Sequence, residues 1–243
     1  MFEKVETYKL LAELRSRASR VGEGKLNILL FGAPGCGKGT HSEWLKAEMG
    51  LCHISTGDAL REEIASGSEL GKKVEGILTR GELVDDQTVL DIVAGKMARN
   101  PKAPGYLLDG YPRTLEQARS LDALLAEKNS RITAVLYFKA SEDTLKFRIC
   151  GRRIHKASGR TYHVVNKPPK VEGKDDVTGE DLMQRPDDNE QSLVTRLKTF
   201  YEQTAPLLDY YGEQHILNTF NADEEAASVK RDVQAVLKIG GQQ

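Results

Sequence analysis

The chain has 243 residues, of which 39% are hydrophobic and 29% charged, a composition typical of globular proteins and unlike that of disordered, collagenous or coiled-coil chains. Its 35 basic and 36 acidic residues leave a formal net charge of -1, so no overall positive charge favours a nucleic-acid partner. No apolar run approaches the ~18 residues needed to cross a bilayer, and no membrane partner is expected.

Residues 1–25 are predicted to form a helical N-terminal extension. Apolar residues recur at roughly helical spacing from Phe2 to Leu14. Glu3, Glu6 and Glu13 are unlike the acid-poor composition of a mitochondrial presequence, and no long apolar run marks a secretory signal. The 3 cysteines of the chain are too few for a disulfide framework, which favours reduced thiols. We therefore expect a cytoplasmic protein, with the mitochondrial intermembrane space as an open alternative.

After residue 25, short apolar runs alternate with longer amphipathic ones. The pattern predicts strands over 27–31, 51–54, 106–109, 132–138 and 215–218. It predicts helices over 38–49, 85–100 and 114–128, a helix capped by Ser141, a helix starting at Asn189 and a last helix over 226–237. Pro206 should kink or end the helix from Asn189. Strands that alternate with helices of this length indicate an α/β fold with a parallel sheet covered on both faces.

The alternation breaks between Gly151 and Asp188. Glycines and prolines punctuate only short segments there, and no single long helix fits them. This segment is predicted to be an inserted lobe with its own hinge.

A glycine-rich loop follows the first predicted strand and opens the first helix. Residues 32–40 read Gly-Ala-Pro-Gly-Cys-Gly-Lys-Gly-Thr, the pattern of a phosphate-binding loop. Its backbone N–H groups and the helix N-terminus would face a phosphate, with Lys38 reaching the β- and γ-phosphates. The general pattern has Ser or Thr directly after the lysine, whereas here Gly39 takes that place and Thr40 follows. The lysine and the strand–helix context favour phosphate binding over a glycine turn of purely structural role.

Asp109 ends the predicted strand 106–109, in the run Leu-Leu-Asp-Gly-Tyr-Pro-Arg that finishes at Arg113. A carboxylate at this position suits a magnesium ion held through water beside nucleotide phosphates. Taken alone, an acidic residue at a strand end is a weak signal.

Together these motifs resemble the adenylate kinase family in its long-lid form. The resemblance covers about residues 26–237 and includes Ser55-Thr-Gly-Asp58, Arg61, Asp109 to Arg113, Gly151-Arg-Arg153 and the run from Asn166 to Arg185. It implies a three-layer α/β core of about five parallel strands, made of residues 26–54, 85–150 and 189–243. It also implies an AMP-binding subdomain over 55–84, a lid over 151–188, and reversible, magnesium-dependent transfer of the γ-phosphoryl group of ATP to AMP, giving two ADP.

The resemblance also implies a set of site residues. The ATP phosphates would be bound by Gly35, Cys36, Gly37, Lys38, Gly39 and Thr40, and the ATP base by Arg152, Thr161, Tyr162 and Glu224. The AMP site would comprise Thr56, Arg61, Glu82, Leu83, Val84, Gly110, Tyr111, Pro112, Arg113, Gln117, Arg185 and Arg196. Catalysis would rest on Lys38, Arg113, Arg152, Arg185 and Arg196, because phosphoryl transfer depends mainly on positioning and on stabilising negative charge.

In some members of the family, four lid positions carry cysteines that bind zinc. Here these positions are His155, Ser158, Asp175 and Thr178. Because hydroxyls are poor zinc ligands, we predict a hydrogen-bonded network and no structural zinc. Asp187 and Asp188 fall at the expected lid hinge, where an exposed acidic pair is the default expectation and pairing with arginines on lid closure is the alternative.

Other functions are weighed against this one. A GTPase switch is disfavoured. Asn166-Lys167 matches the start of the guanine-binding motif Asn-Lys-x-Asp, but Pro169 occupies the position where that motif requires Asp. An idle nucleotide-binding module would be expected to lack Lys38, Asp109 or an arginine, and all are present. A GTP:AMP phosphotransferase or another nucleoside monophosphate kinase shares most of these motifs and stays open. The expected partners are ATP, AMP and ADP, and a monomer is expected because no large apolar stripe is visible.

Overall fold

The computed structural model describes residues 25–237, and the helix predicted near the N-terminus lies outside them. Its centre is a five-stranded parallel sheet with the strand order β2-β3-β1-β4-β8. The strands are β1 (Leu26–Phe31), β2 (Cys52–Ser55), β3 (Gly105–Asp109), β4 (Ala134–Lys139) and β8 (Leu217–Asn221). The central strand β1 pairs with β3 on one side and β4 on the other, with Ile28 opposite Leu107 and Ala134. The predicted α/β class is therefore confirmed.

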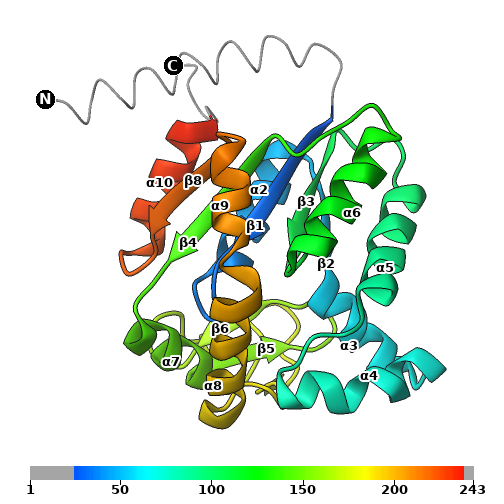
Figure 1. Ribbon diagram of the computed structural model, residues 1–243. Coiled ribbons are helices and arrows are strands. Elements are labelled where there is room, and N and C mark those ends of the chain that lie inside the picture. Colours follow the sequence, from blue (N-terminus) through cyan, green and yellow to red (C-terminus); the bar gives the residue numbers. More distant parts are fainter. Residues whose placement is uncertain (1–24, 238–243) are drawn as a thin grey trace, which may run out of the picture.

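Helices cover both faces of this sheet, with α2 behind it and α6 and α9 in front in the view of Figure 1. The core helices are α2 (Lys38–Met49), α5 (Asp86–Arg99), α6 (Leu115–Ala126), α7 (Glu142–Cys150), α8 (Glu190–Thr199), α9 (Leu207–Glu213) and α10 (Ala226–Leu237). Capping explains where several of them begin. Ser141 accepts a hydrogen bond from the Thr144 N–H, as predicted, and Asn189 caps α8 in the same way.

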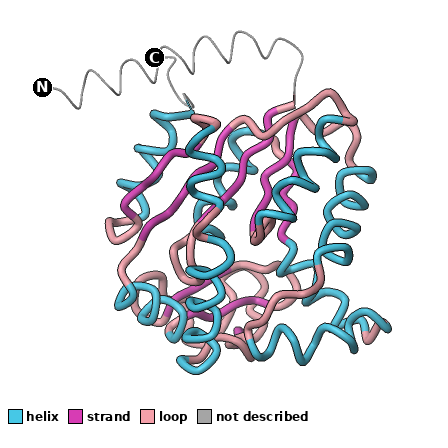
Figure 2. The backbone as a smooth tube through the Cα atoms, viewed as in Figure 1, coloured by secondary structure: helices cyan, strands magenta, loops and turns pink. Residues whose placement is uncertain are grey.

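Two insertions lie at the carboxyl ends of the strands, in the lower part of Figure 1. The first contains α3 (Thr56–Ser66) and α4 (Glu69–Arg80). The second is a small antiparallel sheet of β5 (Arg152–His155), β6 (Thr161–His163) and β7 (Leu182–Met183). Much of the segment 151–188 consists of loops and turns, drawn in pink in Figure 2. Both insertions therefore border the edge of the sheet where the phosphate loop lies.

Two boundaries near the C-terminus differ from the sequence-based expectation. The last strand starts at Leu217 rather than His215, because His215 has a positive φ of 56° that interrupts extended backbone. The helix from Asn189 continues through a π-helical turn, η1 (Phe200–Thr204), before α9 begins after Pro206. The break expected at Pro206 is present, and the π-helical turn before it is not visible in the sequence.

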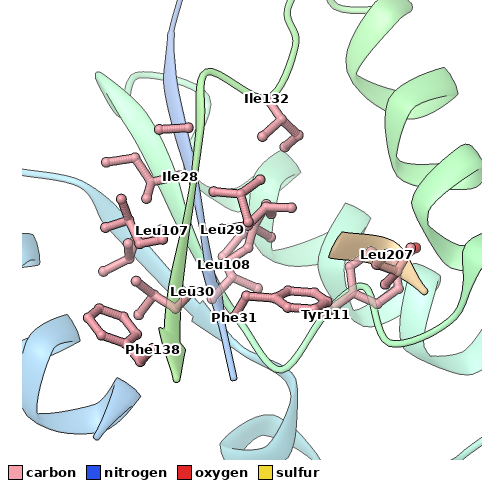
Figure 3. Packing of buried hydrophobic residues seen from close by; sticks show 14 of the residues in the cluster. Ile28, Leu29, Leu30, Phe31, Leu107, Leu108, Tyr111, Ile132, Phe138 and Leu207 are labelled. Atoms are coloured by element: carbon pink, nitrogen blue, oxygen red, sulfur yellow. The ribbon is translucent and has the colours of Figure 1, made fainter. Parts of the chain in front are cut away.

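The core lies between the sheet and its helices. Leu29 in β1 and Leu108 in β3 are 0% exposed, and Phe31 packs near Tyr111 and Leu207 in Figure 3. Asn27 is a buried polar exception whose side-chain amide donates to Ser130 Oγ and to the Arg131 carbonyl. The apolar packing fixes the ends of β1 and β3, which carry the phosphate loop and Asp109.

Candidate active site

A cavity of about 1740 Å³ opens at the carboxyl ends of the central strands. Its lining comes from the phosphate loop, both insertions and α8, and includes Lys38, Arg61, Asp109, Arg113, Arg152, Arg185 and Arg196. Ligands in open parallel sheets bind at this edge, where chain segments from neighbouring strands diverge. The fold thus brings residues from across the sequence into one concave site.

The phosphate loop has the backbone shape that its glycines allow. Gly35 and Gly37 have φ values of 88° and 102°, in the region that side chains disfavour. A Cβ on Gly35 would also lie 2.8 Å from the carbonyl oxygen of Leu145, so the loop packs closely on α7. Within residues 25–237, no side chain caps the start of α2, which leaves its first N–H groups for an anion.

Lys38 is folded back over this loop. Its Nζ donates to the carbonyl oxygen of Gly32 at 2.7 Å and to that of Ala33 at 3.2 Å. The Sγ of Cys36 lies 3.6 Å from the same Nζ, and the cysteine is 1% exposed. The ammonium group is therefore held above the loop, where a bound phosphate would meet it.

Asp109 lies beside this loop, at the end of β3. Burial opposes the ionisation of its carboxyl group, but His53 and the positive charge of Lys38 outweigh it and lower the pKa. His53 Nε2 is 3.9 Å from Asp109 Oδ2. An ionised carboxylate next to a phosphate site fits magnesium, which keeps several waters and takes few protein ligands.

An arginine cluster lines the same cavity as the phosphate loop, and aspartates hold it in place. Arg61 and Arg185 both donate to Oδ1 of Asp58, at 2.6 Å and 3.1 Å. Arg196 donates to Asp187 Oδ2 at 2.9 Å, and Arg152 Nε donates to Asp188 Oδ2 at 2.7 Å. Burial opposes the ionisation of Asp58, but Arg61 and Arg185 outweigh it and lower its pKa to about 2.

The cluster keeps an excess of positive charge. Burial, together with the charges of Arg61 and Arg152, lowers the pKa of Arg185 to about 10. Burial also lowers the pKa of Arg196 to about 10, with Arg152 and Arg113 contributing in the same direction. Cations that repel one another at this range would be stabilised by an added anion. The electrostatics of the cluster therefore favour a polyanionic ligand.

Arg113 and its neighbours form a tight turn after β3. The Arg113 Nε and the hydroxyl group of Thr56 both donate to the Gly110 carbonyl, at 2.8 Å and 2.9 Å. Gln117 is 2% exposed, and its Oε1 accepts from the Arg113 backbone N–H at 2.7 Å. Its Nε2 donates to Asp86 Oδ1 at 2.7 Å. The turn thus fixes both the Arg113 guanidinium and the Gln117 amide.

The structure does not bring every predicted residue to the cavity surface. Those that line it are Gly35, Cys36, Gly37, Lys38, Gly39, Thr40, Arg61, Leu83, Asp109, Gly110, Pro112, Arg113, Arg152, Thr161, Tyr162, Arg185, Arg196 and Glu224. Thr56, Val84, Tyr111 and Gln117 are buried behind the lining. Glu82 is exposed and forms an ion pair with Arg80, with contacts of 2.9 Å and 2.8 Å.

The four lid positions form the predicted network. His155 Nδ1 lies 2.7 Å from Ser158 Oγ, and Thr178 Oγ1 donates to Asp175 Oδ2 at 3.0 Å. Arg160, which the sequence reading did not single out, joins Asp175 at 2.6 Å. Among the described residues, no group of three or more His, Cys, Asp or Glu side chains could hold a metal ion. Hydrogen bonds therefore tie the two lid turns together.

Three further residues had been given no role from the sequence: Asp58, His53 and Asp86. Asp58 belongs to a quoted motif, and its position one turn before Arg61 was a usable signal. His53 and Asp86 gave none, because Asp109 and Gln117 lie 56 and 31 residues further along the chain.

Comparison with known proteins gives consistent matches. The family model described as adenylate kinase matches residues 30–216. Adenylate kinase 3 of Oryza sativa subsp. japonica is 42% identical over 235 residues, which cover 97% of this chain and 98% of that protein. An adenylate kinase of Trichomonas vaginalis is 44% identical over 218 residues, covering 89% of this chain and 95% of that protein. Within residues 25–237, no helix is long and apolar enough to cross a membrane.

Proposed function

The chain belongs to the adenylate kinase family, and on that basis we propose which of its residues carry out the reaction. It is a nucleoside monophosphate kinase with adenylate kinase activity, the reversible transfer of a phosphoryl group from ATP to AMP. One observation supports the assignment of residues. A single cavity is lined by positively charged residues that come from separate parts of the chain: Lys38, Arg61, Arg113, Arg152, Arg185 and Arg196.

The reaction brings two polyanions together, so the site must offset their repulsion. Lys38 and the N–H groups of the phosphate loop bind the ATP phosphates. In this structure the Lys38 ammonium donates to the carbonyl groups of Gly32 and Ala33. A phosphate oxygen can replace these carbonyl groups without leaving the ammonium unpaired. Magnesium, when bound with ATP, would offset further phosphate charge, with Asp109 holding it through water.

Arg61 and Arg113 bind the AMP phosphate, because a planar guanidinium can donate two parallel hydrogen bonds to phosphate oxygens. The Nε of Arg113 is already held by the Gly110 carbonyl at 2.8 Å, so its terminal nitrogens are left to donate. Arg152, Arg185 and Arg196 stabilise the transferring group from the opposite side. No general base is required, since positioning and charge stabilisation supply most of the rate.

Other residues in or next to the same cavity are proposed to bind the bases of ATP and AMP. The ATP base binds near Thr161, Tyr162 and Glu224, which line the cavity. Gln117 is buried behind the lining in this structure, and AMP binding uncovers its amide, which then binds the adenine. Leu83, Gly110 and Pro112 border the pocket in front of it. Closure of the lid segment 151–188 excludes water, which would otherwise accept the phosphoryl group and turn the enzyme into an ATPase.

The direct test of this assignment is a bisubstrate mimic, two adenosines joined by five phosphates. It should bind the purified chain and raise its thermal midpoint, because it fills both nucleotide sites at once. Coupled assays with ATP and each of AMP, GMP, UMP and CMP test the acceptor, and AMP should be used best. Absence of binding, or faster use of GMP or UMP, would contradict the assignment.

We also propose that the protein acts as a monomer in the cytoplasm. Among residues 25–237, three exposed large apolar side chains lie on different helices, Phe147 on α7, Val194 on α8 and Tyr201 on η1. The other five lie in the lid: Val164, Val165, Val171, Val177 and Met183. All 3 cysteines are free thiols. Sedimentation analysis and cell fractionation test both points, and recovery in the mitochondrial intermembrane space would replace the cytoplasmic assignment.

A further inference from the structure

The side-chain amide of Gln117 is held at both of its ends. Its Oε1 accepts from the Arg113 backbone N–H, and its Nε2 donates to Asp86 Oδ1, both at 2.7 Å. Each of these two hydrogen bonds is possible in only one orientation of the amide. In the reversed orientation, two N–H donors would face each other at Arg113, and two oxygen acceptors would face each other at Asp86.

These two contacts use half of the hydrogen-bonding capacity of the amide, and the other half serves a ligand once AMP binding uncovers the buried Gln117 side chain. An amide oxygen can accept two hydrogen bonds and an amide nitrogen can donate two. Within residues 25–237, the Gln117 side chain uses one acceptor position in its bond with Arg113 and one donor position in its bond with Asp86. One acceptor position and one donor position therefore remain next to each other, in a fixed order.

That order fits one class of base. Adenine offers a 6-amino donor beside the N1 acceptor, so its edge can donate to Oε1 and accept from Nε2. A 6-oxo purine, such as hypoxanthine or guanine, offers an acceptor at position 6 beside an N1–H donor. It would need the amide reversed, and a freely rotating glutamine could supply that.

We propose that Asp86 is a specificity-determining positioning residue, which locks the Gln117 amide in the orientation that accepts 6-amino purines and rejects 6-oxo purines. This rests on the proposed role of Gln117 in AMP binding. Asp86 does not touch the base and acts only through Gln117. It reaches Gln117 because it is the first residue of α5, while Gln117 lies in the first turn of α6, which packs beside it.

The test compares AMP with IMP, which differ in the 6-amino and 6-oxo groups and the proton on N1. The readout is the ratio of kcat/KM for AMP to kcat/KM for IMP, with ATP as donor. In Asp86→Ala this ratio should fall about tenfold, equal to about 1.4 kcal/mol of discrimination, while kcat at saturating AMP stays close to that of the parent. A ratio that does not change in Asp86→Ala overturns the proposal.

A matched control lies on the same helix. Asp91 accepts from Gln87 Nε2 at 2.7 Å in an exposed carboxylate–amide pair. Asp91→Ala removes the same kind of bond away from the site and should leave the AMP-to-IMP ratio unchanged. Asp86→Asn keeps the size of the side chain, so it tests the loss of the carboxylate in a variant that is expected to fold normally. It should lower the ratio in the same direction, with a thermal midpoint close to that of Asp91→Asn.

A double-mutant cycle separates this proposal from the function it rests on. If Asp86 acts through Gln117, Asp86→Ala combined with Gln117→Ala should be no worse than Gln117→Ala alone. Losses that multiply in the double variant would overturn the positioning role. If Gln117→Ala leaves both the KM for AMP and the ratio unchanged, the proposed AMP site is wrong, and the inference falls with it.

Discussion

Arg152 of the lid and Asp188, which precedes α8, form an ion pair at the base of the lid. The Arg152 Nε lies 2.7 Å from Asp188 Oδ2, and a terminal nitrogen of the same guanidinium contacts Oδ1. Asp188 is 1% exposed. Burial opposes ionisation of Arg152, but the hydrogen bond and charge of Asp188 outweigh it and raise the pKa. The pair fixes the orientation of Arg152 before nucleotide is bound.

Asp188→Asn should therefore lower stability. A guanidinium that loses its charged partner at a largely buried position costs about 1–3 kcal/mol of unfolding free energy. Urea unfolding measures the change. The control is Asp181→Asn, because Asp181 pairs with Lys174 at 2.7 Å but its side chain is 86% exposed. Equal losses in the two variants would contradict a structural role for the Arg152–Asp188 pair.

Lys38→Met should collapse turnover while the fold is kept. The substitution removes a positive charge from the phosphate loop, and loss of one such stabilising group typically lowers kcat about 100- to 1000-fold. Steady-state assays with ATP and AMP measure the effect. Lys102→Met, an exposed lysine outside the cavity lining, is the control and should behave like the parent. Near-normal transfer by Lys38→Met would remove its assigned role.

Arg113→Ala should chiefly weaken the use of AMP. Loss of hydrogen bonds to a charged phosphate is expected to raise the KM for AMP about 10- to 100-fold, with a smaller effect on the KM for ATP. Arg119 on α6 provides the comparison, because it is exposed and pairs with Glu116 at 3.2 Å. Unchanged AMP kinetics in Arg113→Ala would place the acceptor site elsewhere.

The stability of the protein should depend on His41 at mildly acidic pH. The imidazole stacks on Phe138 with a centroid distance of 4.7 Å, and its Nδ1 accepts from Trp44 Nε1 at 3.1 Å. Burial, with smaller contributions from Arg148 and Lys230, lowers the pKa of His41 from 6.5 to about 4. Between these values the unfolded chain binds more protons, so the unfolding free energy falls as the pH drops, by up to about 3 kcal/mol.

The difference between the parent and His41→Gln isolates this contribution. Unfolding free energies measured from pH 7 to pH 4 should converge as the pH falls, because the variant lacks the titrating group. His215→Asn, at an exposed position, should follow the parent. Parallel curves for the parent and His41→Gln would show that His41 does not carry this pH dependence.

The lid should hold its shape without zinc. His155 and Asp175 are 2% exposed, and Asp175 accepts from the Tyr162 hydroxyl group as well as from Arg160. Treatment with a chelator should leave the thermal midpoint of the purified protein unchanged, because hydrogen bonds hold the lid turns. Stoichiometric zinc in elemental analysis, or destabilisation by the chelator, would contradict this.

Several parts of the fold could be predicted because their causes are local. The phosphate loop requires glycines at strained positions, and Gly35 and Gly37 occupy them. The cap at Ser141 and the break at Pro206 follow from side chains within a few residues. The start of the last strand was wrong by two residues, because a single positive φ at His215 has no clear signal in a sequence of mixed polarity.

The sequence by itself indicated the kind of chemistry, since a glycine-rich loop with a lysine, placed between a strand and a helix, is the pattern of a phosphate-binding loop. The tertiary structure decided how that chemistry is controlled. Asp58 meets Arg185 across 127 positions, and Asp86 meets Gln117 across 31. Hydrogen bonds and charges act over a few ångströms in space and do not depend on separation along the chain, so only the packed fold selects these partners.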